Sequence, residues 1–164
     1  MGKQIILVTV ILLGGGMLLQ SPVLALDAVS IPAAALVAGD NDVDYFTNGV
    51  RMAVDSSSDD QFLQAPVELP HKAVIRRIIL EGKDSSGSGS IDVGLREFRR
   101  NTYLDLVRVS TSANETPGDF RRGMGLSHEV NNSRYSYGIE VVINNGNDWN
   151  AVWYYKVVIK YVTP

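Results

Sequence analysis

A large aromatic side chain among polar residues is the feature of this sequence that most resembles a binding site. Trp149 lies in the run 144–150, beside Asn147 and Asp148. An indole ring offers a flat apolar surface and its polar neighbours offer hydrogen bonds, a combination that suits a sugar ring or a peptide. Trp149, Asp148 and Asn147 are therefore the candidate ligand-binding residues. The alternative, in which Trp149 folds back over the open end of the core, is favoured by the average burial of large aromatic side chains.

An acidic run offers the second kind of chemistry, calcium binding. Residues 40–44 read Asp-Asn-Asp-Val-Asp, with carboxylates at alternate positions as in a calcium loop. The EF-hand pattern then requires Gly at its sixth and Glu at its twelfth position, where this chain has Tyr45 and Arg51. We expect a solvated acidic turn and no cofactor. A looser Ca²⁺ site, sharing carboxylates of residues 55–60, is the alternative, and the oxygen-rich run 144–148 is another such candidate.

The residue types that most often carry out catalysis are scarce. The chain has two histidines, His71 and His128, and no cysteine. A structural zinc site needs more nitrogen and sulfur ligands than these, and no G-x-S-x-G or H-E-x-x-H pattern is present. A histidine paired with a carboxylate could serve a hydrolase. We expect both histidines to be exposed or structural, and we assign no catalytic residue.

The charge of the chain argues against polyanionic partners. It has 15 basic and 18 acidic residues, so there is no basic excess to drive binding to nucleic acid or to an anionic membrane. Arginines nevertheless crowd the middle of the chain. On a strand face they are usually solvated, but arginine is also common at protein interfaces, so we expect contact with a second copy or with other surface proteins or glycans. The residues concerned are Arg96, Arg99, Arg100, Arg121 and Arg122, with Glu97 and Asp119 nearby.

The elements that must position these residues are β-strands. The clear periodicities are of two residues, and no segment shows a capped helical pattern. Runs of Ser, Gly, Asn and Asp separate the apolar segments as turns do. The spacing predicts an all-β fold, an antiparallel β-sandwich resembling a jelly roll with about eight strands. They are predicted at residues 33–38, 50–54, 62–67, 74–80, 91–98, 104–109, 135–143 and 152–162, with a ninth possible at 125–130.

Strict alternation also predicts which side chains share a face. In the last predicted strand, alternation places Trp153, Tyr155, Val157, Ile159 and Tyr161 together.

Two adjacent arginines, Arg76 and Arg77, interrupt the predicted strand 74–80. They should point to opposite faces, so one of them must find a partner near the core or extend its charged end to water.

The first 25 residues indicate export. Lys3 precedes an apolar run over residues 5–19, and the segment ends in Val23-Leu24-Ala25, with small side chains where a signal peptidase reads them. A permanent membrane span needs roughly 20 apolar residues, and three consecutive glycines weaken this segment as a helix. We expect a signal peptide at 1–25 and one domain at 26–164, secreted or in the cell envelope, with a retained anchor as the alternative. Without cysteine, neither disulfides nor a lipoprotein anchor can form.

Three segments resemble small secreted bacterial β-sandwich proteins of unknown function. They are Ile31-Pro32-Ala33-Ala34-Ala35, the run from Ala65 to Ile75 (APVELPHKAVI), and the closing Val158-Ile159-Lys160-Tyr161. The resemblance implies a tight turn at 69–73, where a glycine often replaces Lys72. It also implies a location outside the cytoplasm. It implies no catalytic residue.

The sequence therefore favours an exported, non-catalytic β-sandwich that belongs to a surface, a matrix or an extracellular assembly and acts by protein interaction. A carbohydrate-binding module is the alternative. A small polysaccharide-active enzyme is less favoured, because no pair of carboxylates stands out at a hydrolytic spacing.

Overall fold

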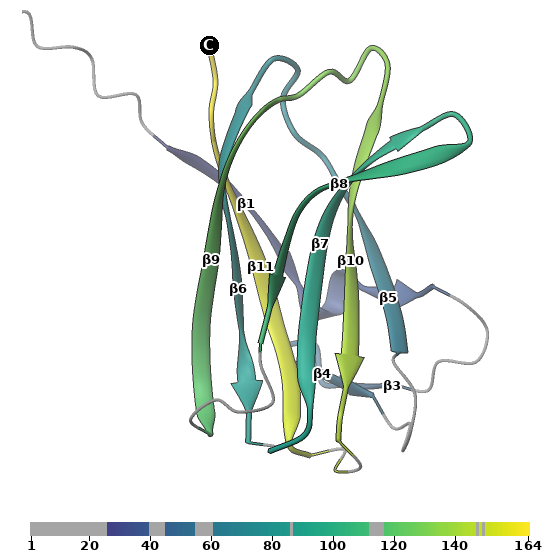
Figure 1. Ribbon diagram of the computed structural model, residues 1–164, viewed down its shortest axis with the longest axis vertical. Coiled ribbons are helices and arrows are strands. Elements are labelled where there is room, and N and C mark those ends of the chain that lie inside the picture. Colours follow the sequence, from purple (N-terminus) through teal and green to yellow (C-terminus); the bar gives the residue numbers. More distant parts are fainter. Residues whose placement is uncertain are drawn as a thin grey trace, which may run out of the picture.

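Two antiparallel β-sheets pack face to face in the computed structural model, so the predicted all-β sandwich is confirmed (Figure 1). The structure describes residues 26–39, 45–54, 61–85, 87–111, 117–146, 148 and 150–164. The predicted signal peptide at 1–25 and the acidic run 40–44 lie outside the described residues. Within the described residues, no helix has the length and apolar content that a membrane crossing requires.

The first sheet has the strand order β3–β4–β11–β6–β9, and β1 also pairs with β11. Its strands are β1 (Asp27–Pro32), β3 (Tyr45–Thr47), β4 (Met52–Val54), β6 (Val74–Asp84), β9 (Gly118–Glu129) and β11 (Val152–Val162). The second sheet has the order β2–β5–β10–β7–β8. Its strands are β2 (Val37–Ala38), β5 (Gln61–Val67), β7 (Ser90–Arg99), β8 (Thr102–Ser110) and β10 (Ser136–Asn144).

The strands from β4 to β11 form a jelly roll. In the first sheet they follow the order β4–β11–β6–β9, and the facing sheet has the order β5–β10–β7–β8. This is the arrangement of eight antiparallel strands in two four-stranded sheets. The prediction of a jelly-roll-like sandwich is confirmed, and β1, β2 and β3 are additions to it.

The predicted strand at 33–38 is wrong. Ala33–Ala35 form a short 3-10 helix, and a regular strand resumes only at Val37. The physical reason is the route of the chain, which leaves β1 in the first sheet and joins β2 in the second. The chain must turn between the two sheets, and the small side chain of Ala33 is buried against the core at this turn.

The core lies between the sheets and follows the predicted alternation along β10. Tyr137, Ile139, Val141 and Ile143 are buried there, as expected from the period of two. The inward side chains of β5 and β7 show the same pattern. Fully buried large residues of both sheets meet in this layer, among them Met52, Leu63, Ile75, Ile78, Leu80, Ile91, Leu95 and Ile159.

The shared face predicted for β11 is confirmed from Val157 onward but is wrong for Trp153, because a bulge changes the alternation between them. The register against β6 shifts between Tyr154 and Lys156. Tyr154 and Val157 therefore both belong to the core, while Trp153 lies outside it. Trp153 is still covered, with the Arg51 guanidinium 3.9 Å from its ring centre.

A second bulge resolves the problem of the adjacent arginines in β6. The register shifts beside Arg76 in both of the pairings that β6 makes, so Ile75 and Ile78 are both buried. Arg76 and Arg77 are consequently both exposed, instead of pointing to opposite faces as predicted. Arg76 donates a hydrogen bond to the Ser127 hydroxyl at 3.3 Å.

The tight turn predicted at residues 69–73 is present. The Ala73 N–H donates to the Pro70 carbonyl at 3.1 Å, and Lys72 has a φ of 65°. This left-handed conformation is unfavourable for a residue with a Cβ atom and favourable for glycine.

Replacing Lys72 with glycine should therefore raise the free energy of unfolding by about 0.5–1 kcal/mol, since it removes the Cβ strain. Chemical denaturation measures the change. Lys72→Ala is the control, because it removes the charge and keeps the Cβ. If the alanine variant gains as much stability as the glycine variant, backbone strain is not the cause.

Candidate functional site

The predicted loop site is described only in part. Trp149 and Asn147 lie outside the described residues, whereas Asp148 is exposed. The Asp148 carboxylate accepts the N–H of Asn150 at 3.0 Å, so it stabilises the turn before β11. The binding role of this loop stays a prediction.

The two histidines have structural partners. The His71 ring accepts the N–H of Asn132 at 3.2 Å. His128 on β9 does not use its neighbour Glu129; it lies 3.1 Å from a carboxylate oxygen of Glu97 on β7. The Glu97 side chain is only 2% exposed, and the cluster joins the two sheets.

Further partners surround the Glu97 carboxylate. Arg99 lies 2.8 Å from it, and the Tyr137 hydroxyl donates to it at 3.3 Å. Burial, together with the nearby Glu97 charge, raises the pKa of Tyr137, so its phenol remains a donor. With its hydrogen bonds met inside the fold, this carboxylate has the surroundings of a structural group.

Metal ligands do not converge in the part of the chain that the structure describes. No three His, Cys, Asp or Glu side chains lie close enough together there to hold an ion. The candidate calcium site at 40–44, and the residues 55–60 that could add carboxylate ligands to it, lie outside that part.

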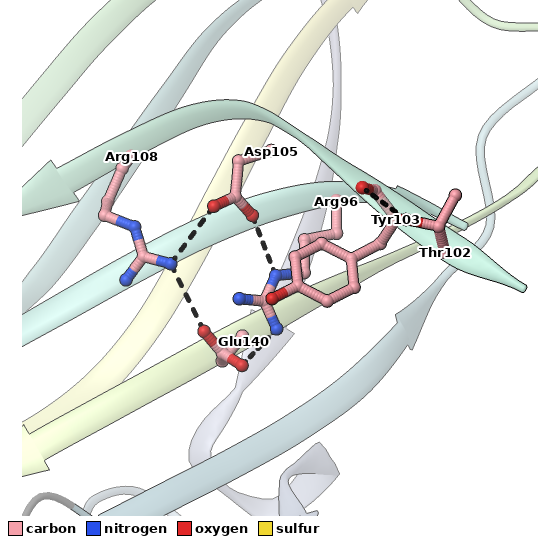
Figure 2. A network of polar contacts seen from close by, with 6 residues as sticks. All are labelled: Arg96, Thr102, Tyr103, Asp105, Arg108 and Glu140. Carbon is pink, nitrogen blue, oxygen red and sulfur yellow. Dashed lines mark hydrogen bonds and ion pairs between the residues drawn. The ribbon is translucent and has the colours of Figure 1, made fainter. Parts of the chain in front are cut away.

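A network of ion pairs lies on the outer face of the second sheet, the face directed away from the core (Figure 2). Arg96 on β7 pairs with Asp105 on β8 at 2.8 Å and with Glu140 on β10. Arg108 on β8 reaches the same two carboxylates, at 3.4 and 3.3 Å. Two arginines and two carboxylates thus alternate across three neighbouring strands.

A bulge in β8 makes this network possible. Leu95 pairs with Val107 and Arg96 pairs with Asp105, so Leu106 is the extra residue. In a regular strand Asp105 and Arg108 would point to opposite faces, because they are three residues apart. The bulge brings both to the outer face.

The ion pairs extend over a position without a side chain. At Gly94 a Cβ atom would make an ordinary contact with Arg108 Nη2, 3.4 Å away. The sequence points to Arg96 but not to Asp105, Arg108 and Glu140, since only the strand register brings these residues together.

The charges in the network shift the pKa values of its members. Burial alone would lower the pKa of Arg96, but the hydrogen bond to Asp105 and the negative charges around it outweigh burial and raise it. Burial would likewise raise the pKa of Asp105, yet Arg96 and Arg108 lower it overall. Both groups are therefore charged at neutral pH.

Aromatic side chains border the network. The Arg96 guanidinium lies 4.0 Å from the ring centre of Tyr103, which is 51% exposed. Figure 2 shows the Tyr103 ring beside Arg96 at one end of the ion pairs. Phe98 meets Tyr103 edge to face, with ring centres 6.5 Å apart, so two exposed rings lie next to a fixed array of charges.

A shallow hollow of about 320 Å³ continues from Phe98 across the same face. Its floor passes over Gly138, where a Cβ atom would lie 2.9 Å from the Phe98 ring. The lining is mostly apolar and comes from β2, β5, β7 and β10, including Val37, Gln64, Pro66 and Ser136. The absence of a side chain at Gly138 lets the Phe98 ring form one wall.

No family model and no curated protein sequence matches the chain. Among solved structures, the C-terminal CBM6 domain of LamC, a marine laminarinase from Zobellia galactanivorans, is 12% identical with a TM-score of 0.49, over 81% of this chain and 98% of that one. The CBM36-1 domain of a xylanase from the hindgut metagenome of Trinervitermes trinervoides is 9% identical with a TM-score of 0.46, over 84% and 99%.

A GH26-CBM35 β-(1,4)-mannanase from Podospora anserina is 13% identical with a TM-score of 0.44, over 84% of this chain and 28% of that one. Because these identities and TM-scores are low, the fold and the candidate site of this chain are described from its own strand order and side chains.

The ion-pair network should make stability depend on acid pH. The pKa of Asp105 is lower in the folded state than its ordinary 3.8. The contribution of the Asp105 carboxylate to the free energy of unfolding is therefore present above about pH 4, and it is lost as the pH falls through the folded-state pKa. We expect wild type to lose about 0.2–1 kcal/mol more between pH 6 and pH 3 than Asp105→Asn, the range for a solvent-exposed ion pair.

Urea denaturation at the two pH values measures this difference. Glu129→Gln is the control, because Glu129 is exposed and has no ion-pair partner among the residues described. Equal acid sensitivity of wild type and Asp105→Asn would show that the network does not stabilise the fold.

Proposed function

We propose that this chain is an exported, non-catalytic carbohydrate-binding protein whose ligand lies across the outer face of the second sheet. One observation carries the proposal: two exposed aromatic rings, Phe98 and Tyr103, border an apolar hollow and a fixed network of arginines and carboxylates. Sugars present apolar ring faces and many hydroxyl groups, and this surface supplies a partner for each.

The shape of the face supports an extended ligand. Gly94 and Gly138 occupy outward positions on adjacent strands, so no side chain projects from the outer face at these two positions. Phe98 stands at one side of the hollow and Val37 lines it from β2. A chain of sugar rings could lie along this surface with little rearrangement of the backbone.

The polar groups are held in place before any ligand arrives. Arg96 is bound by two carboxylates and by the Tyr103 ring, and its side chain is only 12% exposed. A side chain that is already ordered loses little entropy on binding, which favours affinity for weakly bound ligands such as sugars. The ends of Asp105 and Arg108 that face solvent remain available to hydroxyl groups.

The same network favours binding over hydrolysis. A glycosidase needs a carboxylic acid whose pKa is raised so that it can protonate the leaving group. The pKa of Asp105 moves in the opposite direction because Arg96 and Arg108 surround it. The Glu140 carboxylate pairs with the same two arginines.

A protein partner is the second candidate, and it rests on a different surface. Leu104 on β8 is 42% exposed and Met124 on β9 is 50% exposed. Both strands lie at the edges of their sheets, where unpaired backbone groups can accept another chain. An extracellular assembly protein would use this edge and not the face that carries Phe98.

Substituting Phe98 with alanine tests the carbohydrate proposal. The purified domain is titrated against soluble β-glucan, mannan and xylan, and the tightest ligand is then used for the variants. Losing the ring should weaken binding by about tenfold, because the stacking surface is gone. Arg96→Gln should weaken binding as well, since it releases the network.

The matched control is Phe46→Ala. Phe46 is also an exposed phenylalanine, 52% accessible, but it lies on the first sheet against Trp153. It should leave affinity unchanged. Absence of binding to every polysaccharide, or an equal loss in both phenylalanine variants, would contradict the proposal.

A further inference from the structure

A group of basic side chains lies on the outer face of the first sheet, on the opposite side of the sandwich from the proposed carbohydrate face. Arg77 on β6, Arg121 on β9 and Lys160 on β11 line a hollow of about 270 Å³. Ile79 and Gly123 line it too, together with Arg122. The sequence as a whole has more acidic than basic residues, so this local excess of positive charge runs against the overall balance.

Arg77 and Lys160 form a pair of like charges. They are direct cross-strand partners in the antiparallel pairing of β6 with β11. Their neighbours Ile78 and Ile159 are buried, so both cations extend to the outer side. Like charges directly opposite each other destabilise a sheet. Neither has an ion-pair or side-chain hydrogen-bond partner within the described residues.

Among the described residues, the acidic group that pairs with the cations of this face is Glu81, and it is already engaged. Glu81 pairs with Arg121 at 3.0 Å and with Lys156 at 3.2 Å. It therefore leaves positive charge in excess where Arg121, Arg77 and Lys160 meet around the hollow.

The backbone leaves space between these charges. Gly123 pairs with Ile79, and a Cβ atom at Gly123 would lie 2.7 Å from Arg77 Nε. The missing side chain thus lets the Arg77 guanidinium lie low against the strand. Ile79 faces outward and is still only 4% exposed, so it gives the hollow an apolar floor.

We propose that this hollow binds an oxyanion, a sulfate, phosphate or carboxylate group, between Arg77, Arg121 and Lys160. An anion there neutralises the cross-strand repulsion, and guanidinium groups bind such anions through two parallel hydrogen bonds. The group comes from a free inorganic ion or from an acidic sugar. The site is separate from the proposed carbohydrate face, so either can fail without the other.

The test is thermal unfolding at low ionic strength, where charge effects are least screened. Sodium sulfate, sodium phosphate and a glucuronate oligosaccharide are added in turn, and sodium chloride at equal ionic strength is the reference. A ligand that binds the folded state raises the unfolding temperature with its concentration. We expect a rise beyond that in chloride for at least one of the three anions, and the anion that binds most tightly identifies the source.

We expect Arg77→Gln to lower the affinity for the anion and to raise the unfolding temperature of the anion-free protein. It should weaken anion binding by about tenfold, as expected for losing a charged hydrogen-bond donor. It should also raise the unfolding temperature without added anion, since it removes the repulsion with Lys160. A purely structural arginine would lower that temperature. Gly123→Ala should weaken binding without a change in charge, because it displaces the Arg77 side chain.

Arg76→Gln is the matched control. It removes the same charge from the adjacent residue, which is also exposed, bonds to Ser127 and does not line the hollow. Anion affinity should then stay as in wild type. No stabilisation beyond that in chloride, or equal losses in the Arg76 and Arg77 variants, would overturn the proposal.

Discussion

The apolar layer between the two sheets decides which side of every strand faces outward, and the surface chemistry of this protein depends on where that alternation is interrupted. Register shifts occur in β6 beside Arg76, in β8 at Leu106 and in β11 at Tyr155. Each keeps apolar side chains inside while it moves polar or aromatic ones out. The shift in β8 brings Asp105 and Arg108 to one face, and the shift in β6 exposes two adjacent arginines. Bulges of this kind commonly redirect side chains near binding sites. Both proposed sites therefore arise from the same packing constraint.

The two outer faces differ in how their charges are balanced. On the second sheet, arginines and carboxylates alternate, and Arg96 is held from three sides by Asp105, Glu140 and the Tyr103 ring. That surface is ordered and close to neutral, which suits an uncharged ligand with many hydroxyl groups. On the first sheet, Arg77 and Lys160 face each other without an acidic partner among the described residues. In our proposal, a bound anion neutralises the repulsion between these two cations. Glycines lie beneath both arrays, Gly94 in one and Gly123 in the other, and a Cβ atom at Gly123 would occupy space that Arg77 uses.

The sequence predicted the fold better than the sites. Alternation in β10 and the aromatic, β-branched composition of β11 located these strands well, because burial on one face leaves a period of two. The strand predicted at 33–38 failed because the chain crosses between sheets there, a tertiary event with no local pattern. The face predicted for Trp153, and the opposite faces predicted for Arg76 and Arg77, were wrong because a single inserted residue reverses the alternation. Glu140 and Arg96 are 44 residues apart, and their contact depends on strand register, which one sequence does not contain. A positive φ at Lys72 marks the turn that the resemblance to small secreted β-sandwich proteins implied.

In our proposal, the outer face of the second sheet is a preformed ligand-binding surface. Amide chemical shifts of the isotopically labelled protein, followed while the tightest-binding oligosaccharide is added, test it most directly. Glycine amides report on the floor of that face without interference from side chains. We expect the largest changes at Gly94, Phe98, Ser136 and Gly138, with small changes elsewhere in the sheet. Changes confined to the loop at 144–150, or to the edge strands around Leu104 and Met124, would contradict it.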